Sequence, residues 1–581
     1  MPQKFKAISE NFGRVFQRYP MVLAFALIAT FAMILVSGNS FGTKDLKIYN
    51  SLLTAFFGIP LTFAAKMLSQ RIGKEIPIQI ASLLLLGLLW NLLPEDKESY
   101  LKIHALVLIP CFILCNLLVV VLPFIGKSDK NTFWNYNISL FLRFISALVF
   151  TGILTVGVLF ALLTIDQLFN ARLENSIFIR TFCTFSILGS CYAFLLLCGQ
   201  GLSDLKKKTS YPQYLKFFTQ FVLIPLLLVY GAILYFYAAK ILFAWRLPKG
   251  WVSVLILTYG TLGIFAQLLI YPLTKTQTTA WVKLFNRVFY FSLIPLLILL
   301  FIAISTRLYA YGYTEMRYFT LVLAIWLAFI TGYHLLSSNP SIKLIPITLL
   351  AGGLFAVSFP YLNAFSVTKR SQKEAFQRFL SEERLVKNGK LIPHKTIDYE
   401  TSSALAEKIV FFRDRSFHEP LLEILPNSQA QKYNQIKNDP YFSSYAFVEE
   451  FFMNEESTPS KVYKSIYSTQ LAVEIKNYRY FLSPMDINTP ITVGSEVFVL
   501  DDTAKVILID GKETIALKPY LEDLYRRRNE DQIAENLFLE ILRSNNRKIK
   551  VGLSRLSYFE AADGRNVDPD FSISVSYILV E

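Results

Sequence analysis

Eleven apolar runs lie within residues 21–360 of the chain, and each is about long enough to cross a bilayer as a helix. A helix needs about 20 mainly apolar residues to cross the hydrocarbon core of a membrane. The runs lie at about 21–37, 48–68, 77–94, 101–125, 138–165, 177–199, 217–243, 251–273, 288–305, 318–336 and 342–360. The last run is the weakest, because AGGLF interrupts it. The sequence therefore predicts an α-helical polytopic membrane bundle of about 11 transmembrane helices.

The distribution of charge separates this bundle from the rest of the chain. Residues 1–363 contain 29 Lys and Arg but 11 Asp and Glu, whereas residues 364–581 contain 29 and 32. The excess of positive charge lies among the apolar runs, where it fits the anionic headgroups of a lipid bilayer and not a nucleic acid. We therefore expect a transmembrane domain over residues 21–363 and a soluble domain over residues 364–581.

Residues 1–20 precede the first run and have a pattern of their own. Apolar side chains recur at helical spacing with four Lys or Arg among them, which predicts an amphipathic segment on the membrane surface. If this leader is cytoplasmic, its side of the membrane carries sixteen Lys and Arg in the leader and connectors, and the opposite side nine. The positive-inside rule then predicts a cytoplasmic N-terminus. An odd number of spans places the tail outside the cytoplasm.

The tail combines helices with strands. Surface helices are expected from about residue 364 to Asn388-Gly389 and around SALAEKIVFF. The short strands EVFVLDD, AKVILID and ETIALK are joined by the Asp-rich turns that hairpins use. A charged helix over about 519–544 and the strands KIKVGLSRLSYF and FSISVSYILV close the chain. These elements predict a C-terminal α+β, strand-rich soluble domain.

A charged connector, TRLYAYGYTEMRYF, joins the ninth and tenth runs. Its charges predict a small ion-pair cluster at the membrane edge, among tyrosines whose rings favour the headgroup region. Three uses are open: docking of the first helix of the tail, binding of a lipid phosphate or another ligand, or a plain interfacial anchor. The residues of this candidate docking site are Arg307, Tyr311, Glu315, Arg317, Lys369, Arg370 and Gln372.

The connector and the start of the tail together resemble a known family. The pattern R-x-x-x-Y-G-x-T-x-x-R-Y precedes the tenth run, and A-F-S-V-x-x-R-S-Q follows the eleventh. The matching residues are Arg307, Tyr311, Gly312, Thr314, Arg317 and Tyr318, then Ala364, Phe365, Ser366, Val367, Arg370, Ser371 and Gln372. Over about residues 20–390 the chain resembles the bacterial polytopic membrane proteins of domain of unknown function family forty-one fifty-three. The resemblance implies a multi-pass protein of the bacterial inner membrane. That family has no assigned activity, so no catalytic residue carries over.

Polar side chains inside the runs form a second set of candidate residues. Asn91 and Asn116 could bridge neighbouring helices through hydrogen bonds. Arg143 and Lys240 lie near the ends of runs, where long side chains can reach the headgroups. No run has an Asp or Glu at its centre, which argues against a carrier coupled to protons or sodium.

Signatures of catalysis and of metal binding are missing from the sequence. It contains no GxSxG, HExxH or P-loop motif, and its five cysteines all lie in apolar runs as expected buried hydrophobes. His418 lies in RDRSFHEP beside Asp414 and Glu419, a pattern typical of a surface salt-bridge cluster. We therefore predict no catalytic residue, no metal site and no cofactor.

These observations favour a non-enzymatic envelope protein in an assembly or regulatory role. Its soluble domain, residues 364–581, would bind a protein partner of the envelope. A transporter or lipid-handling protein is the first alternative, and a wide polar cavity in the bundle would favour it. A membrane-embedded enzyme on lipid-linked substrates is the second, and it requires a lipid-lined groove with converging Asp, Glu or His.

Overall fold

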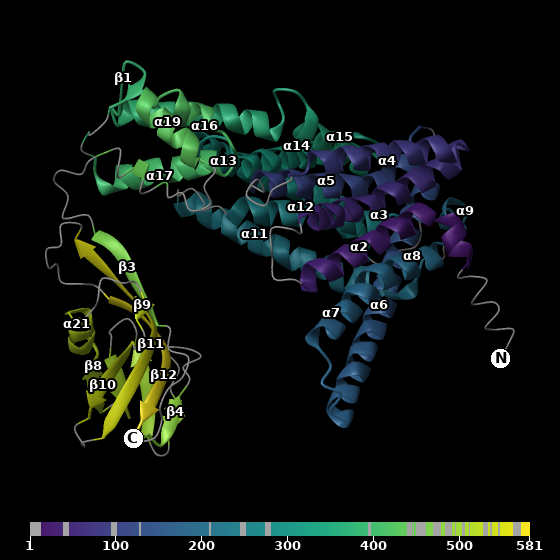
Figure 1. Ribbon diagram of the computed structural model, residues 1–581. Coiled ribbons are helices and arrows are strands. Elements are labelled where there is room, and N and C mark those ends of the chain that lie inside the picture. The colour runs from purple at the N-terminus through teal and green to yellow at the C-terminus, as the bar shows by residue number, and fades with distance from the viewer. Residues whose placement is uncertain are drawn as a thin grey trace. The chain divides into compact units, whose positions relative to one another are not determined.

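The structure is a computed structural model (Figure 1). It describes residues 13–38, 46–94, 102–126, 129–207, 211–244, 251–272, 280–392, 395, 397–437, 444, 447–448, 452, 461–468, 478–482, 491–493, 496–501, 506–510, 512–526, 533–534, 537–543, 547–561 and 571–581. The chain forms two compact units, Met1–Leu391 with Lys408–Phe442, and Ile392–Glu407 with Ser443–Glu581. Most of the predicted amphipathic leader lies outside the described residues.

Long helices build most of the first unit. They are α2 (Pro20–Gly38), α3 (Leu46–Ile72), α4 (Glu75–Leu92), α5 (Lys102–Val121), α6 (Lys130–Phe169), α7 (Asn175–Cys183), α8 (Ser190–Cys198), α11 (Ile224–Ala244), α12 (Trp251–Ile270), α13 (Ala280–Tyr311), α14 (Glu315–Leu336) and α15 (Leu344–Ser358). A π-helical turn, Thr184–Gly189, joins α7 to α8, and α10 (Gln213–Phe217) leads through another, Phe218–Leu223, into α11. A short helix, α9 (Leu202–Leu205), lies between these two groups.

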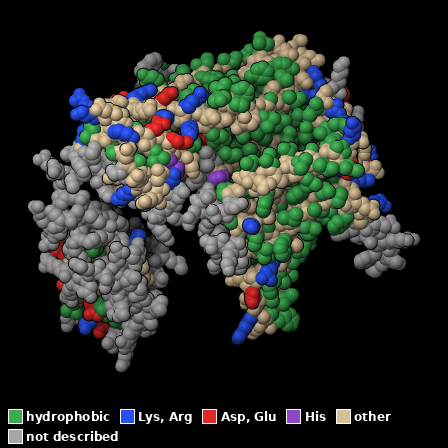
Figure 2. All heavy atoms as spheres, turned by 45° about the horizontal axis from the view of Figure 1, so that its top comes forward, with side chains coloured by type: hydrophobic (Ala, Val, Ile, Leu, Met, Phe, Trp, Pro, Cys, Tyr) green, Lys and Arg blue, Asp and Glu red, His purple; other side chains and the backbone are tan. Residues whose placement is uncertain are grey.

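Ten of these segments are long and apolar enough to cross a membrane, counted over the described residues. They coincide with the first ten predicted runs. The eleventh corresponds to α15, an apolar helix of 15 residues. Figure 2 shows a broad hydrophobic face on the first unit, with Lys, Arg, Asp and Glu mostly at its margins. The prediction of a helical, multi-pass membrane bundle is therefore confirmed.

The bundle is held together by buried side chains and by small residues at close helix crossings. One core joins α11, α12, α13 and α14 around Ile256, Leu293 and Leu327. In this core a Cβ added at Gly263 would lie 2.0 Å from the Phe289 ring. Small residues let membrane helices approach this closely because they leave room for the facing side chain. Such packing holds the helices together where apolar lipid provides little hydrophobic driving force.

The bundle is followed, in the described part of residues 364–437, by the helices α16 (Ala364–Glu382), α17 (Tyr399–Arg413), α18 (Glu419–Leu422) and α19 (Asn427–Ile436). The predicted first helix of the tail ends at Glu382, earlier than expected. Residues 386–391 form a hairpin, β1 (Val386–Lys387) and β2 (Lys390–Leu391). Asn388 and Gly389 have φ angles of 55° and 76° at its turn, as the Asn-Gly dipeptide favours.

The described residues of the second unit form two sheets. The larger has the order β4-β12-β11-β3-β9, with β10 also paired to β11, and the smaller has the order β5-β6-β7-β8. The strands are β3 (Lys461–Ser468), β4 (Tyr480–Leu482), β5 (Ile491–Val493), β6 (Glu496–Asp501), β7 (Val506–Ile509), β8 (Glu513–Ala516), β9 (Ile533–Ala534), β10 (Phe538–Leu542), β11 (Lys548–Ala561) and β12 (Phe571–Val580). Both sheets and helix α21 (Lys518–Arg526) share one hydrophobic core. The predicted strand-rich soluble region is confirmed.

The predicted helix over 519–544 is wrong in its second half. α21 ends at Arg526, and residues 538–542 form β10, which pairs antiparallel with β11. In β10 buried and more exposed side chains alternate, the pattern of a strand that covers a core on one face. Arg543 follows β10 and joins the two sheets, because its guanidinium lies 2.8 Å from both Glu496 and Glu513.

Candidate functional site

The connector between α13 and α14 is a tight turn that requires glycine. α13 ends at Tyr311 and α14 begins at Glu315. Between them Gly312 has a φ of +70°, and a Cβ added there would lie 2.8 Å from Ser371 Oγ. The left-handed conformation and the close approach of α16 both disfavour a larger residue at this position.

α16 covers the backbone of this turn. Ser371 Oγ accepts a hydrogen bond from the Tyr313 amide at 2.9 Å. Gln372 Nε2 donates to the carbonyl of Tyr311 at 3.1 Å and to that of Tyr313 at 2.8 Å. The last carbonyls of a helix have no partner within the helix. α16 therefore provides, through Gln372, a donor that the end of α13 needs.

The cationic residues of α16 bind other groups. Lys369 Nζ lies 2.9 Å from Glu419 Oε1, and Arg370 Nη2 donates to the carbonyl of Tyr361 at 2.7 Å. Successive residues of a helix point about 100° apart, so Arg370 points away from Gln372. Lys369 lies on the same face as Gln372 but one turn earlier, where Glu419 is its partner. Of the three tail residues predicted to dock on the connector, the structure thus brings Gln372 to it and places Lys369 and Arg370 elsewhere.

Glu315 forms a buried ion pair with Arg415, a partner that the sequence reasoning missed. Arg415 Nε and Nη2 donate to the two carboxylate oxygens at 2.8 and 3.1 Å. The Glu315 side chain is 1% exposed and the Arg415 side chain 12%. The guanidinium carbon also lies 3.7 Å from the centre of the Phe411 ring. Two parallel charge-assisted hydrogen bonds in a buried setting make this the strongest polar contact at the connector.

The expected ion-pair cluster of Arg307, Glu315 and Arg317 does not form. Arg317 Nη1 donates to the Gly312 carbonyl at 3.0 Å, and its guanidinium lies 5.3 Å from the Tyr311 ring centre. Residues two apart on a helix do not face one another, so Glu315 turns inward while Arg317 covers the turn. Arg307 makes no ion pair with any residue that the structure describes.

The missed partner had only a weak signal in the sequence. Arg415 stands 100 residues from Glu315, in the segment interpreted above as a surface cluster. No spacing rule connects positions so far apart. The available clue is chemical: a carboxylate in the first turn of an apolar helix, once buried, requires a cation.

The intramembrane polar candidates do not converge on one site. Asn91 Nδ2 donates to the Gly87 carbonyl and Asn116 Nδ2 to the Phe112 carbonyl, each at 2.8 Å within its own helix. In this structure both amides bond to the carbonyl four residues earlier, and bridging of neighbouring helices stays a prediction.

The two basic candidates also differ in their surroundings. Arg143 Nη1 donates to the Leu197 carbonyl at 2.7 Å, so this α6 residue holds the end of α8. Lys240 is exposed on α11. Neither residue contributes to the connector.

Comparison with known proteins agrees with this architecture. The family model described as a domain of unknown function, DUF4153, matches residues 21–385. An uncharacterized protein of Pasteurella multocida (strain Pm70) is 24% identical over 412 residues, which cover 70% of this chain and 66% of that protein. No solved structure matches the chain. Because the family model covers more than half of the chain, the protein belongs to the DUF4153 family.

Proposed function

We propose that this protein is a non-enzymatic scaffold of the bacterial inner membrane, with an assembly or regulatory role, that presents its soluble part to an envelope protein. The observation that carries the proposal is the buried Glu315–Arg415 ion pair. It fixes the helices that follow the bundle onto the edge of the bundle itself.

Further contacts support a rigid platform at this edge. Lys369 and Lys373 of α16 pair with Glu419 and Glu423 at 2.9 and 2.6 Å. Exposed pairs of this kind contribute about 0–1 kcal/mol each. Their role is orientation, while the buried ion pair fixes the register of the contact, because separating its partners would leave a buried charge unpaired. A plain interfacial anchor would not need this set of specific contacts.

The second unit has features suited to binding a protein. β4 stands at the edge of the described large sheet, and its residue Tyr480 is 46% exposed. Leu542, at the end of β10, is 57% exposed. An edge strand carries unpaired backbone groups that an extended segment of another protein can pair with. Exposed Tyr and Leu side chains add apolar area to such a contact.

Photocrosslinking from the full-length protein in native membranes tests this proposal. A photoreactive amino acid replaces Tyr480 or Leu542 in turn, and Lys512, exposed on the turn between β7 and β8, provides the matched control position. We expect one protein adduct of the same identity from positions 480 and 542 and a much weaker one from 512. Repeated absence of any adduct at 480 and 542, or equal adducts from all three positions, would contradict partner binding by this unit.

A further inference from the structure

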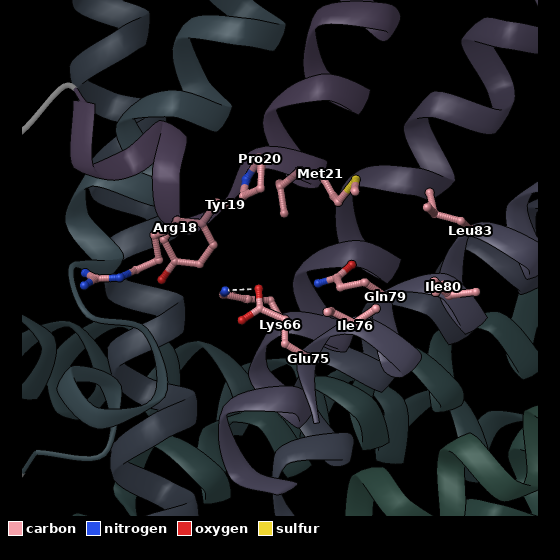
Figure 3. A pocket seen from close by; sticks show the side chains of 11 residues that line it. Arg18, Tyr19, Pro20, Met21, Lys66, Glu75, Ile76, Gln79, Ile80 and Leu83 are labelled. Carbon is pink, nitrogen blue, oxygen red and sulfur yellow. Dashed lines mark hydrogen bonds and ion pairs between the residues drawn. The ribbon is translucent and has the colours of Figure 1, made fainter. Parts of the chain in front are cut away.

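A cavity of about 450 Å³ lies at one edge of the bundle, between the start of α2, the end of α3 and the start of α4 (Figure 3). α3 ends at Ile72 and α4 begins at Glu75, so the cavity adjoins the turn between them. Lys66 stands six residues before the end of α3, a rise of about 9 Å. If α3 and α4 span the bilayer and their turn lies at its surface, the cavity lies near the depth where headgroups meet acyl chains.

One wall of the cavity is apolar and open to the lipid. Met21, Ile76 and Ile80 form it, and each is exposed on the outer surface of the bundle. Exposed apolar side chains at this depth contact acyl chains. The cavity is thus reachable from the bilayer.

The rest of the lining is more polar and carries a surplus of positive charge. Arg18, Lys66 and Glu75 line it, two cations and one anion. The Lys66 side chain is 9% exposed and pairs with Glu75, whose side chain is 53% exposed. Arg18 Nη1 donates to the Gly199 carbonyl at 2.8 Å, which orients the guanidinium. A lysine this buried in a membrane protein is unfavourable unless it has a structural or binding role.

Tyr19 provides a second, independent sign of a ligand. Its side chain lines the cavity, it is 1% exposed, and its hydroxyl has no hydrogen-bond partner among the described residues. In the view of Figure 3 the hydroxyl is drawn between the Arg18 guanidinium and the Lys66 amino group. A buried polar atom without a partner is costly, and a bound ligand that accepts its hydrogen bond removes the cost.

We propose that this cavity binds the phosphate of an anionic glycerophospholipid. The phosphate oxygens accept hydrogen bonds from Lys66, Tyr19 and Arg18, and an acyl chain lies along the apolar wall. The single surplus positive charge of the polar wall matches the single negative charge of phosphatidylglycerol. Basic pockets between membrane helices bind anionic headgroups by this chemistry. The assignment is independent of partner binding by the second unit.

Native mass spectrometry of the purified full-length protein, titrated with phosphatidylglycerol, tests the assignment. Lys66→Met removes the cation at nearly constant volume, and Lys240→Met, at an exposed lysine of α11, is the matched control. We expect the first variant to bind the lipid about tenfold more weakly and the control to bind as the wild type does. Phosphatidylcholine, which has no net charge, should bind the wild type about tenfold more weakly than phosphatidylglycerol.

Tyr19→Phe keeps the test decisive if Lys66→Met fails to fold. It removes one hydroxyl and leaves the packing intact, so the apo protein should be as stable as the wild type or more so. We expect about threefold to tenfold weaker phosphatidylglycerol binding, an effect that a purely structural hydroxyl would not have. Unchanged lipid binding in folded Tyr19→Phe and Lys66→Met proteins would overturn the assignment. Glycerol phosphate binding as tightly as the lipid would also overturn it, since the ligand would then be a soluble phosphate.

Discussion

At the scale of single residues, burial explains the partner of a polar side chain better than the charge pattern of the sequence does. Glu315 begins an apolar helix, and burial makes an unpaired carboxylate there unfavourable. The fold provides Arg415 as its partner, with both hydrogen bonds of a guanidinium fork. The contact joins α14 to the residue just beyond α17. One ion pair thus links the bundle to the helices that follow it.

Removal of one member of this pair should destabilise the protein more than removal of both. Glu315→Met leaves Arg415 buried and uncompensated, at a cost of roughly 3–5 kcal/mol. Combining Glu315→Met with Arg415→Met should recover part of the loss, because an apolar pair of similar volume often replaces a buried ion pair well. Thermal unfolding of the wild type, Glu315→Met, Arg415→Met and the double variant gives the coupling energy.

An exposed ion pair provides the control for this cycle. Lys373 and Glu423 have side chains that are 34% and 52% exposed. Lys373→Met should therefore cost less than about 1 kcal/mol. If the effects of Glu315→Met and Arg415→Met on the free energy of unfolding are additive, the two residues do not interact energetically. The scaffold proposal then loses its main support.

His418 should make stability depend on pH in a defined direction. Burial, helped by nearby Lys437 and opposed by Glu419, lowers the pKa of His418 below its usual 6.5. The unfolded state then takes up a proton at a higher pH than the folded state. Stability is therefore full above about pH 6.5 and falls as the pH drops toward the lower folded pKa.

The variant His418→Gln isolates this contribution. The other three histidines are common to both proteins, so the difference between their unfolding curves reports on position 418. We expect the thermal midpoint of the wild type to fall more steeply than that of the variant between about pH 7.5 and about pH 5.5. Parallel curves would mean that His418 titrates alike in the folded and unfolded chain. The hydrogen bond between His418 Nδ1 and the Tyr433 hydroxyl, at 3.0 Å, is the contact at stake.

At the scale of elements, hydrophobic runs predict spans well and connections poorly. A run of about 20 apolar residues has one stable solution in lipid, so the membrane helices could be placed from the sequence. The soluble elements depend on their neighbours: FLEIL becomes β10 because β11 pairs with it. The Asn-Gly turn is a strong local signal, yet it closes a hairpin instead of ending a helix. The docking of Ser371 and Gln372 on the connector could be expected only as one of three alternatives.

The turn between α13 and α14 should tolerate no side chain at Gly312. Gly312→Ala adds a Cβ 2.8 Å from Ser371 Oγ at a φ of +70°, and backbone strain of this kind costs about 1–3 kcal/mol. Gly332→Ala is the matched control in α14, since a Cβ there meets nothing within 4 Å. Replacing a helical glycine without such constraints by alanine stabilises the folded state by about 0.5–1 kcal/mol. Limited proteolysis should therefore cut the region of α16 faster in Gly312→Ala and not in Gly332→Ala. Equal digestion of both would show that α16 does not depend on this turn.

At the scale of the whole membrane unit, contacts between connectors indicate how often the chain crosses. Lys130 Nζ, at the start of α6, donates to the Asn339 carbonyl between α14 and α15 at 3.0 Å. At the opposite end of the pair formed by α14 and α15, the Tyr318 hydroxyl in the first turn of α14 donates to the Leu362 carbonyl beyond α15. α15 therefore runs beside α14 for its full length. Its 15 residues extend about 22 Å, so a crossing by α15 would require a slight thinning of the bilayer.

If α15 is an eleventh crossing, residues before and after it lie on opposite sides of the membrane and should differ in their reaction with an impermeant thiol reagent. The native cysteines lie in apolar runs, so Ser338→Cys and Glu581→Cys each introduce one accessible thiol into the full-length protein. With the leader in the cytoplasm, as its basic residues favour, a membrane-impermeant maleimide should label position 581 in intact spheroplasts. Position 338 should react only after permeabilisation. If α15 folds back without crossing, ten spans return the tail to the side of the leader, and both positions react under the same condition. That result would leave the second unit in the cytoplasm, beyond the reach of any periplasmic partner, and the proposed scaffold would have to act on the cytoplasmic side.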